Sequence, residues 1–163
     1  MGLDDIFACV EKYPARHVTV TGGEPLAQQS CIALLRLLCD REYEVSLETS
    51  GALDISAVDS RVSRVMDLKT PGSGEQEKNR LGNLEYLSAD DQIKFVICDR
   101  ADYEWSRDML KEHQLVGRCE ILFSPSHEQQ DARQLAEWIL EDGLDVRFQI
   151  QLHKLLWQNE PGR

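Results

Sequence analysis

Segments with the two-residue periodicity of β-strands alternate along this chain with segments that have the spacing of α-helices. Alternation of apolar and polar residues predicts strands at residues 17–21, 44–48, 64–69, 92–98, 120–124 and 146–153. Helical spacing of apolar residues predicts helices at residues 3–10, 26–40, 101–113 and 131–142. This order is typical of a parallel sheet covered by helices, either open and doubly wound or curled into a barrel.

The two faces of each predicted strand differ in polarity. In residues 92–98, for example, apolar Ile93, Phe95 and Ile97 alternate with polar Gln92 and Lys94. A doubly wound sheet is covered on both sides and needs two apolar faces. A barrel-like sheet places its chemistry at the carboxyl ends of the strands. We therefore predict an α/β fold, a partial (β/α) barrel of mostly parallel strands with helices outside, forming one domain over residues 1–163.

The charge balance excludes several classes of function. The 163 residues include 18 Lys and Arg against 29 Asp and Glu, which gives a net charge of −11, and 42% are hydrophobic. Such a chain repels nucleic-acid backbones and anionic lipids. No apolar run approaches the roughly 20 residues that span a bilayer, and the first residues are acidic where a signal peptide is basic. We expect a cytoplasmic protein with no nucleic-acid or membrane partner.

The cysteines are five in number, widely spread and without a C-x-x-C pair. Most of them lie among apolar neighbours, which indicates buried thiols in a reducing compartment rather than disulfides or metal ligands. They are Cys9, Cys31, Cys39, Cys98 and Cys119.

The sharpest local motif is Gly22-Gly23-Glu24-Pro25, between a predicted strand and a predicted helix. The glycines let the backbone approach a ligand closely, and the Glu24 carboxylate suits an ammonium group. Pro25 is favourable in the first turn of a helix. A simple turn with a glutamate at the start of a helix explains the same spacing, so both interpretations remain. The motif is not a P-loop, because no Gly-Lys-Ser/Thr follows.

A strand, the letters GGEP and a helix resemble the second-strand signature of radical S-adenosylmethionine enzymes. GGEP alone identifies only that superfamily. Five more segments follow in order from there, and the ordered set is similar to the 7-carboxy-7-deazaguanine synthase family from about residue 15 to the end. These segments are residues 48–51, 67–73, 92–97, 123–127 and 148–154.

The resemblance implies an enzyme, a carbon–nitrogen lyase that converts 6-carboxy-5,6,7,8-tetrahydropterin to 7-carboxy-7-deazaguanine with loss of ammonia in queuosine and 7-deazapurine biosynthesis. It implies S-adenosylmethionine, a [4Fe–4S] cluster and Mg²⁺ as cofactors. It also implies a small-molecule pterin substrate, a homodimer and a reductant such as flavodoxin.

The resemblance also implies roles for individual residues. The residues expected to bind the cofactor are Gly22, Gly23, Glu24, Glu48, Ser50, Asp67, Leu68, Lys69, Ser124, Pro125, Ser126 and His127. Those expected to contact the substrate are Thr21, Lys94 and His153. Structural roles fit several of these equally: a helix cap for Ser50, ion pairs for Lys69 and Lys94, and ordinary polar contacts for the two histidines. No side chain is identified as a nucleophile or an acid–base pair.

One departure from the family is large. Its members hold the cluster with a C-x-x-x-C-x-x-C loop after the first strand, but Cys31 and Cys39 are eight positions apart on a predicted helix. The chain also begins on a helix, so the preceding strand is expected to be missing. We expect a segment with the cluster cysteines and the magnesium-binding hydroxyl to be absent and the chain alone to be inactive. A truncated gene model, an internal start or a shortened paralogue explains this equally.

Two other classes of function fit the same residues. The chain is alternatively a non-catalytic module that binds S-adenosylmethionine or docks a partner, which binding of the cofactor without iron would support. It is otherwise an unrelated barrel enzyme that uses Glu48, Lys94 and His153 for acid–base chemistry on a carboxylated substrate, which metal-free turnover would support.

Overall fold

The strands of this computed structural model, which describes residues 2–157 and 160, form one curved parallel sheet. The strands are β1 (His17–Val20), β2 (Glu44–Thr49), β3 (Ser63–Asp67), β4 (Gln92–Ile97), β5 (Glu120–Pro125) and β6 (Arg147–Phe148). Neighbours in the sheet are neighbours in the chain, in the order β1-β2-β3-β4-β5-β6, and every pair is parallel. A doubly wound sheet reverses its order at a switch point, whereas a barrel does not. The predicted partial barrel is confirmed, whereas the absence of a family strand that would precede β1 stays a prediction.

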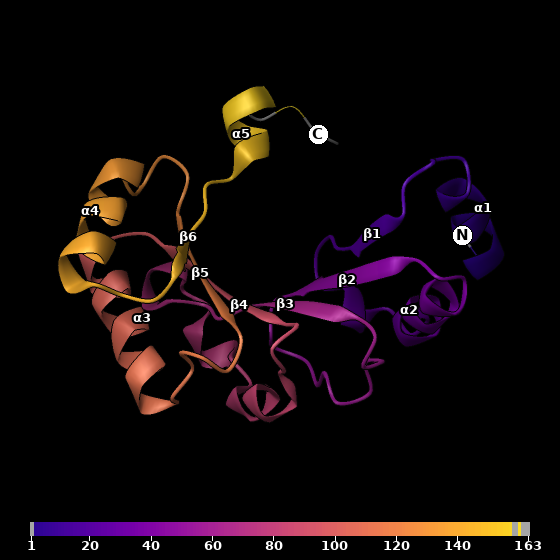
Figure 1. The fold of residues 1–163 in the computed structure, drawn as a ribbon, viewed down its shortest axis with the longest axis horizontal. Helices are drawn as coiled ribbons and strands as arrows, with labels where there is room; N and C mark the ends of the chain where they lie inside the picture. Colours follow the sequence, from indigo (N-terminus) through magenta and orange to yellow (C-terminus); the bar gives the residue numbers. More distant parts are fainter. Residues whose placement is uncertain (1, 158–159, 161–163) are drawn as a thin grey trace.

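Most of the helices lie on the convex side of the sheet, whereas the helix of residues 152–157 lies on the opposite, open side (Figure 1). The α-helices are α1 (Leu3–Val10), α2 (Cys31–Asp40), α3 (Arg100–Glu112), α4 (Ala132–Asp142) and α5 (Leu152–Trp157). Short 3₁₀ turns are η1 (Pro25–Ala27), η2 (Pro71–Ser73), η3 (Gln76–Lys78) and η4 (Leu81–Tyr86). None of the helices in the described part of the chain combines the length and apolarity needed to cross a membrane.

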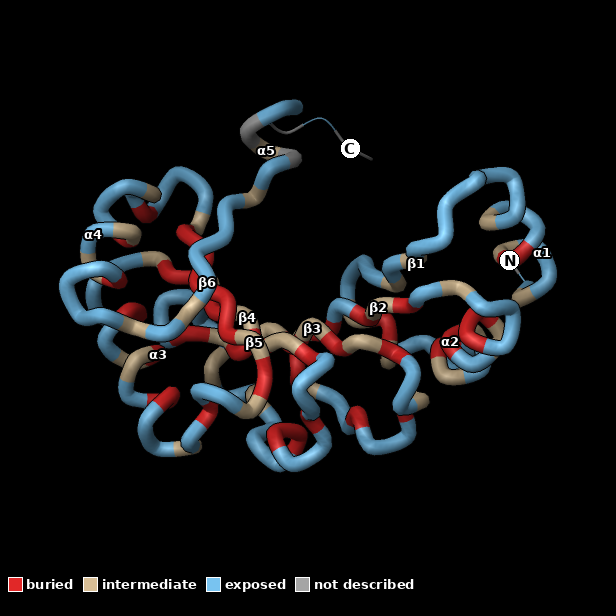
Figure 2. The backbone as a smooth tube through the Cα atoms, in the orientation of Figure 1, coloured by how far each residue is buried: buried red, intermediate tan, exposed pale blue. Residues whose placement is uncertain are grey.

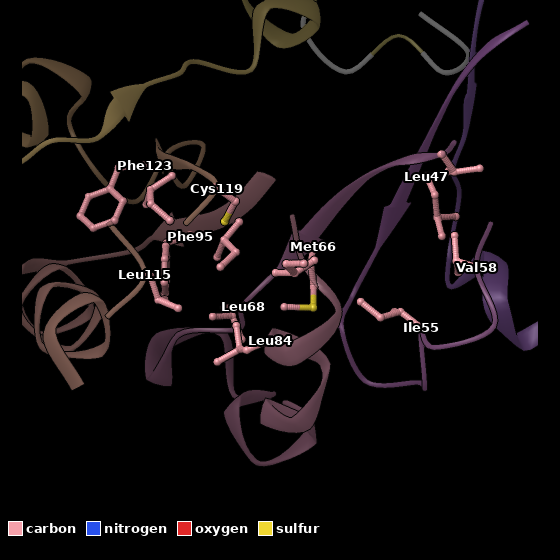
Figure 3. Packing of buried hydrophobic residues seen from close by; sticks show 14 of the residues in the cluster. Leu47, Ile55, Val58, Met66, Leu68, Leu84, Phe95, Leu115, Cys119 and Phe123 are labelled. Atoms are coloured by element: carbon pink, nitrogen blue, oxygen red, sulfur yellow. The ribbon is translucent and has the colours of Figure 1, made fainter. Parts of the chain in front are cut away.

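The hydrophobic core lies between the sheet and its helices, as the buried stretches in Figure 2 show. In β4, Ile93, Phe95 and Ile97 are fully buried on the helical side, while the residues between them are half-buried. Figure 3 shows the same side of the sheet, with Met66, Leu68 and Phe95 packed in one layer. The apolar face predicted from alternation is therefore the face that the helices cover.

Strand β5 departs from the expected pattern. Leu122 and Ser124, which alternate with Ile121 and Phe123, are each only 2% exposed, so both faces of this strand are buried. Strand β5 lies between two other strands, and the chain after β6 turns over the open side toward α5 (Figure 1). The prediction of one polar face is wrong for this strand.

Two predicted elements have different bounds. The helix expected at residues 26–40 is divided into η1 and α2, because residues 28–30 form a turn between them. The strand expected at residues 146–153 ends at Phe148, and residue 153 lies in helix α5. The strand predicted for residues 149–153 is therefore wrong. The alternation of apolar and polar residues in 146–152 runs directly into the helical spacing of residues 152–157. A segment this short fits a strand and a helix equally well.

A buried ion pair joins β3 to the start of β4 beneath the sheet. The side chains of Arg64 and Asp91 are 8% and 1% exposed, and Arg64 Nη1 lies 3.1 Å from Asp91 Oδ2. The guanidinium also donates to the carbonyls of Tyr86 and Val58, and Asp91 Oδ2 accepts the N–H of Ser88 at 2.8 Å. The pair thus connects η4 and the loop before β3 to the sheet.

We expect Asp91→Asn to lower the free energy of unfolding by about 3–5 kcal/mol, because breaking a buried pair leaves the Arg64 charge uncompensated. Urea denaturation followed by circular dichroism measures this loss. The control is Arg133→Gln, which breaks a pair whose side chains are 87% and 54% exposed, and we expect it to cost less than about 1 kcal/mol. Equal losses in the two variants would contradict a stabilising buried pair.

Candidate functional site

The carboxyl ends of the parallel strands meet at one edge of the sheet, where most of the candidate residues lie. Glu24 follows β1, Ser50 follows β2, and Asp67 ends β3. Residues 124–127 cover the end of β5 and the turn after it. This edge is where barrel-like enzymes place their chemistry. Most of the candidates belong to one of three groups: a polar cluster around Glu24, a polar cluster around Asp67, and the wall of a cavity.

The first cluster is built around the carboxylate of Glu24. Oε1 accepts the N–H of Leu26 at 3.1 Å and the hydroxyl of Thr49 at 3.0 Å. Oε2 accepts the N–H of Ser50 at 2.8 Å and also the Ser50 hydroxyl. Glu24 thus joins the end of β1 to the end of β2, and it also caps η1, as the simple-turn interpretation expected. The residues directly after Ser50 form bends and turns up to β3 and no helix, so the helix-cap role for Ser50 is wrong.

These four donors fill the carboxylate, which has about four lone-pair sites. An ammonium group therefore reaches Glu24 only by taking the place of the Thr49 or Ser50 hydroxyl. Burial raises the pKa of Glu24, but the hydrogen bonds from Ser50, Leu26 and Thr49 outweigh burial and hold the pKa below its usual value. The group is therefore ionised at neutral pH and suited to a cation.

The two glycines before Glu24 have the left-handed backbone that their residue type allows. Their φ angles are 99° for Gly22 and 56° for Gly23. A Cβ at either position would meet no described atom within 4 Å, so conformation and not crowding requires glycine here. Both residues are exposed, so their backbone groups are open to a ligand.

The second cluster places two lysines on one carboxylate. Asp67 Oδ2 lies 2.9 Å from Lys69 Nζ, and Asp67 Oδ1 lies 3.7 Å from Lys94 Nζ. Asp67 Oδ1 is buried and has no hydrogen-bond partner among the described residues. The ion pairs expected as structural alternatives for both lysines are thus present. Because two cations share one carboxylate, the cluster keeps a positive charge in a chain whose net charge is −11.

A cavity of about 430 Å³ lies beside the second cluster, at the ends of β3, β4 and β5. Its wall includes Asp67, Lys69, Thr70, Cys98, Ser126 and Gln151. A second cavity of about 300 Å³ shares Ser126 and Gln151 with the first and includes Pro125 and His127. These volumes lie at the small end of the range typical of ligand pockets.

The cavity walls and the predicted candidates overlap only in part. Some wall residues were not predicted, and some predicted residues have side chains that are buried away from the cavities. Gln151 was missed, although its position on a polar alternating stretch was a usable signal. Leu68 and Ser124 are 1% and 2% exposed. The Leu68 side chain belongs to the hydrophobic core, and its N–H donates to the carbonyl of Lys94 at 2.9 Å.

The remaining candidates lie outside the two polar clusters. The Thr21 hydroxyl donates to Glu48 Oε2 at 3.3 Å, and both residues are exposed on the sheet. His127 Nε2 lies 3.5 Å from Glu128 Oε1. The backbone of His153 is in α5, and its side chain lies outside what the structure describes.

The cysteines do not fit an iron–sulfur cluster. Cys9 is exposed on α1, Cys31 and Cys39 are buried in α2, and Cys98 and Cys119 flank opposite ends of neighbouring strands. Burial raises the pKa of the last four thiols, to about 11 for Cys119, whereas metal ligands are thiolates. Among the described residues, no three His, Cys, Asp or Glu side chains are placed to hold a metal ion. The residues present therefore fit neither the cluster nor a carboxylate site for Mg²⁺.

Comparison with solved structures shows a shared fold. The crystal structure of Streptococcus suis SuiB matches with a TM-score of 0.64 at 14% identity, covering 93% of this chain and 43% of SuiB. A second structure, SuiB bound to S-adenosylmethionine, matches with a TM-score of 0.65 and covers 42% of that protein. This chain therefore spans less than half of SuiB, and at this identity the match concerns the fold.

Comparison of sequences gives closer relatives. The chain is 42% identical over 160 residues to the 7-carboxy-7-deazaguanine synthase of Chlorobaculum tepidum, covering 96% of this chain and 73% of the relative. It is 41% identical over 175 residues to the enzyme of the same name from Koribacter versatilis, covering 98% and 77%. No family model matches the chain. The identities over nearly the whole chain show that this protein belongs to the 7-carboxy-7-deazaguanine synthase family.

Proposed function

We propose that this chain binds S-adenosylmethionine and a carboxylated pterin at the carboxyl ends of its strands. The reaction it serves is the conversion of 6-carboxy-5,6,7,8-tetrahydropterin to 7-carboxy-7-deazaguanine with loss of ammonia, a carbon–nitrogen lyase reaction. One observation carries the proposal: an ionised Glu24 follows two exposed left-handed glycines and bonds to Ser50. The SuiB structure with bound S-adenosylmethionine, which shares the fold, supports the choice of cofactor.

Glu24 and the glycine backbone bind the amino-acid part of the cofactor in this proposal. The ligand ammonium takes the place of the Ser50 or Thr49 hydroxyl on the carboxylate. A charged donor replaces a neutral one, so the hydrogen bond to the Glu24 carboxylate becomes an ion pair as well. The residues around the two cavities, Ser126 and Gln151 among them, contact the adenosyl part. In the family reaction, bound S-adenosylmethionine would supply the hydrogen-abstracting chemistry, with the electron coming from a [4Fe–4S] cluster that the described cysteines of this chain do not fit.

The positive cluster binds the substrate carboxylate in this proposal. Lys94 and Lys69 together carry one charge more than Asp67 neutralises. Lys94 is 22% exposed at its side chain, so it is partly desolvated and oriented before the ligand arrives. The protein's own task is to bind and orient, since no described residue forms an evident nucleophile or acid–base pair. The roles of Thr21, Glu48, His127 and His153 stay predictions.

A second function is favoured by the separation of the cysteines. A chain that keeps the cofactor site and holds no cluster is a binding module for S-adenosylmethionine. Binding of S-adenosylmethionine is common to both functions, and binding of the carboxylated pterin distinguishes them. A homodimer, a flavodoxin-type reductant and a cytoplasmic location stay predictions.

We expect Glu24→Gln to weaken S-adenosylmethionine binding by about ten- to hundredfold, because the loss of a charged hydrogen bond costs about 1.5–3 kcal/mol. Isothermal titration calorimetry on the 163-residue chain measures the dissociation constant. The matched control is Glu44→Gln at the other end of β2, whose carboxylate pairs with exposed Arg16. Unchanged affinity in Glu24→Gln would contradict the cofactor role and leave Glu24 as a turn residue.

The same variant gives a pH test of the Glu24 hydrogen bonds. The pKa of Glu24 is lowered in the fold, so its contribution to stability is present above its unfolded pKa of about 4.3 and is lost as the pH falls through the lower folded value. Urea denaturation is expected to show the largest difference between wild type and variant above about pH 5, shrinking toward about pH 3. A difference that does not change with pH would contradict an ionised Glu24.

We expect Lys94→Met to weaken anaerobic binding of 6-carboxy-5,6,7,8-tetrahydropterin by about tenfold or more, with nearly unchanged thermal stability. Methionine keeps the alkyl stem, and Lys69 keeps the shorter bond to Asp67. The control is Lys111→Met on the exposed face of α3. A large loss of stability with unchanged affinity would show instead that Lys94 is a structural member of the ion pairs.

The chain of 163 residues is expected to assemble no stable [4Fe–4S] cluster and to be inactive alone. Its thiols are spread over two helices and two opposite strand ends, and cluster assembly needs thiolates that converge. Anaerobic reconstitution with iron and sulfide, followed by desalting and iron determination, tests this. The Chlorobaculum tepidum relative treated in parallel is the control. A stoichiometric cluster on this chain would overturn the expectation.

A further inference from the structure

A buried carboxylate on α3 connects three parts of the chain at the base of the larger cavity. Asp102 is 1% exposed. Its Oδ1 accepts the N–H of Gly72 at 2.7 Å, and its Oδ2 accepts the Thr70 hydroxyl at 2.9 Å and the N–H of Cys98 at 3.0 Å. All three donors lie outside α3, in the loop after β3 and at the end of β4.

These donors belong to the wall of the larger cavity. Thr70, Gly72 and Cys98 line it together with Asp67 and Lys69. The loop that carries the first two begins directly after Lys69, whose ammonium group pairs with Asp67. The position of this loop therefore determines the shape of the cavity next to the positive cluster.

The loop approaches the carboxylate so closely that only glycine fits. A Cβ at Gly72 would lie 2.6 Å from Asp102 Oδ2, well inside any real contact. Gly72 has no positive φ, so its need for glycine comes from this approach and not from the backbone conformation. This short distance shows, independently of the hydrogen bonds, that the loop packs directly against Asp102.

Capping of α3 does not require the Asp102 carboxylate, although its place in the first turn suits the helix dipole. Asp99 already caps α3, since its side chain accepts the N–H of Asp102 at 2.9 Å. Burying a charged or polar group costs free energy unless hydrogen bonds compensate it, and an apolar residue would fill the same space without that cost. The compensating bonds of Asp102 all go to the cavity wall.

We propose that Asp102 is a positioning residue of the ligand site. It holds residues 70–72 against the end of β4 and so sets the position of Lys69 and of the cavity wall, without touching a ligand itself. The inference rests on the proposed function for its effect on ligand affinity. Its effect on the loop is independent of any ligand.

The first test compares Asp102→Asn with Tyr103→Phe. Asparagine keeps the shape of the side chain, but its NH2 group replaces one carboxylate oxygen and faces the N–H and hydroxyl donors of the cavity wall. The loop therefore loses hydrogen bonds to residue 102. Tyr103, the next residue on α3, is fully buried, and its hydroxyl donates to Trp138 O and Asp142 Oδ2 toward α4. We expect Asp102→Asn to weaken S-adenosylmethionine binding by about tenfold or more, because small misplacements of binding groups have large effects. Tyr103→Phe is expected to lose stability and keep wild-type affinity.

The second test uses Thr70 to separate hydrogen bonding from packing. Its hydroxyl lies between Asp102 Oδ2 and the carbonyl of Val96, at 2.9 and 3.0 Å. Thr70→Val keeps the volume and loses the hydroxyl, whereas Thr70→Ser keeps the hydroxyl. The proposal predicts weakened binding in Thr70→Val and near wild-type binding in Thr70→Ser. Equal affinity in the two variants would overturn it.

Hydrogen–deuterium exchange tests, without a ligand, whether Asp102 holds the loop of residues 70–72 in place. Asp102→Asn is expected to speed exchange of the amides of Thr70, Gly72 and Ser73 specifically, and Tyr103→Phe is expected to leave them unchanged. An increase spread evenly over the chain, or equal in both variants, would mean that Asp102 is only structural. If the wild-type chain binds no S-adenosylmethionine, the proposed function fails while the exchange result still decides the role of Asp102. If wild type binds and Asp102→Asn binds equally, the positioning role fails alone.

Discussion

Parallel pairing of the strands in chain order places the ends of β1 to β5 side by side on one edge of the sheet. Parallel strands need a crossover between them, and every crossover here runs over the convex side (Figure 1). The other face therefore keeps polar groups that a doubly covered sheet would exclude. Residues as distant in sequence as Glu24 and Asp67 thus lie at the same edge of the sheet.

Three carboxylates then determine the chemistry of that edge. Glu24 joins the first two strands and is ionised because its hydrogen bonds outweigh its burial. Asp67 is shared by two lysines and leaves a positive charge for an anion. Asp102 accepts hydrogen bonds from two backbone N–H groups and one hydroxyl and so fixes a loop. The acidic composition of the chain thus coexists with a local site of opposite charge, because each carboxylate has its own set of partners.

Much of this arrangement follows from local sequence patterns, and the rest depends on contacts between distant residues. Alternation in residues 92–97 identified both the strand and its buried face, because every second side chain packs against the helices. The same pattern failed at residues 146–153, where it continues into a helical spacing. The family and the edge of the sheet were predictable from GGEP and the segments that follow it. Other contacts join residues about 25 to 30 positions apart, so no local pattern could reveal them. They are the hydrogen bonds from Thr49 and Ser50 to Glu24 and the hydrogen bond from Gly72 to Asp102.

The most direct test of the ligand site is a titration of the isotopically labelled chain with S-adenosylmethionine, followed by the NMR signals of its backbone amides. The account predicts shifts at Gly22, Gly23 and Ser50 and around Ser126, at the carboxyl ends of the strands. The amide signals of α4, on the convex side, are expected to stay unchanged. Absence of any shift at saturating cofactor, or shifts confined to the convex side, would contradict the account.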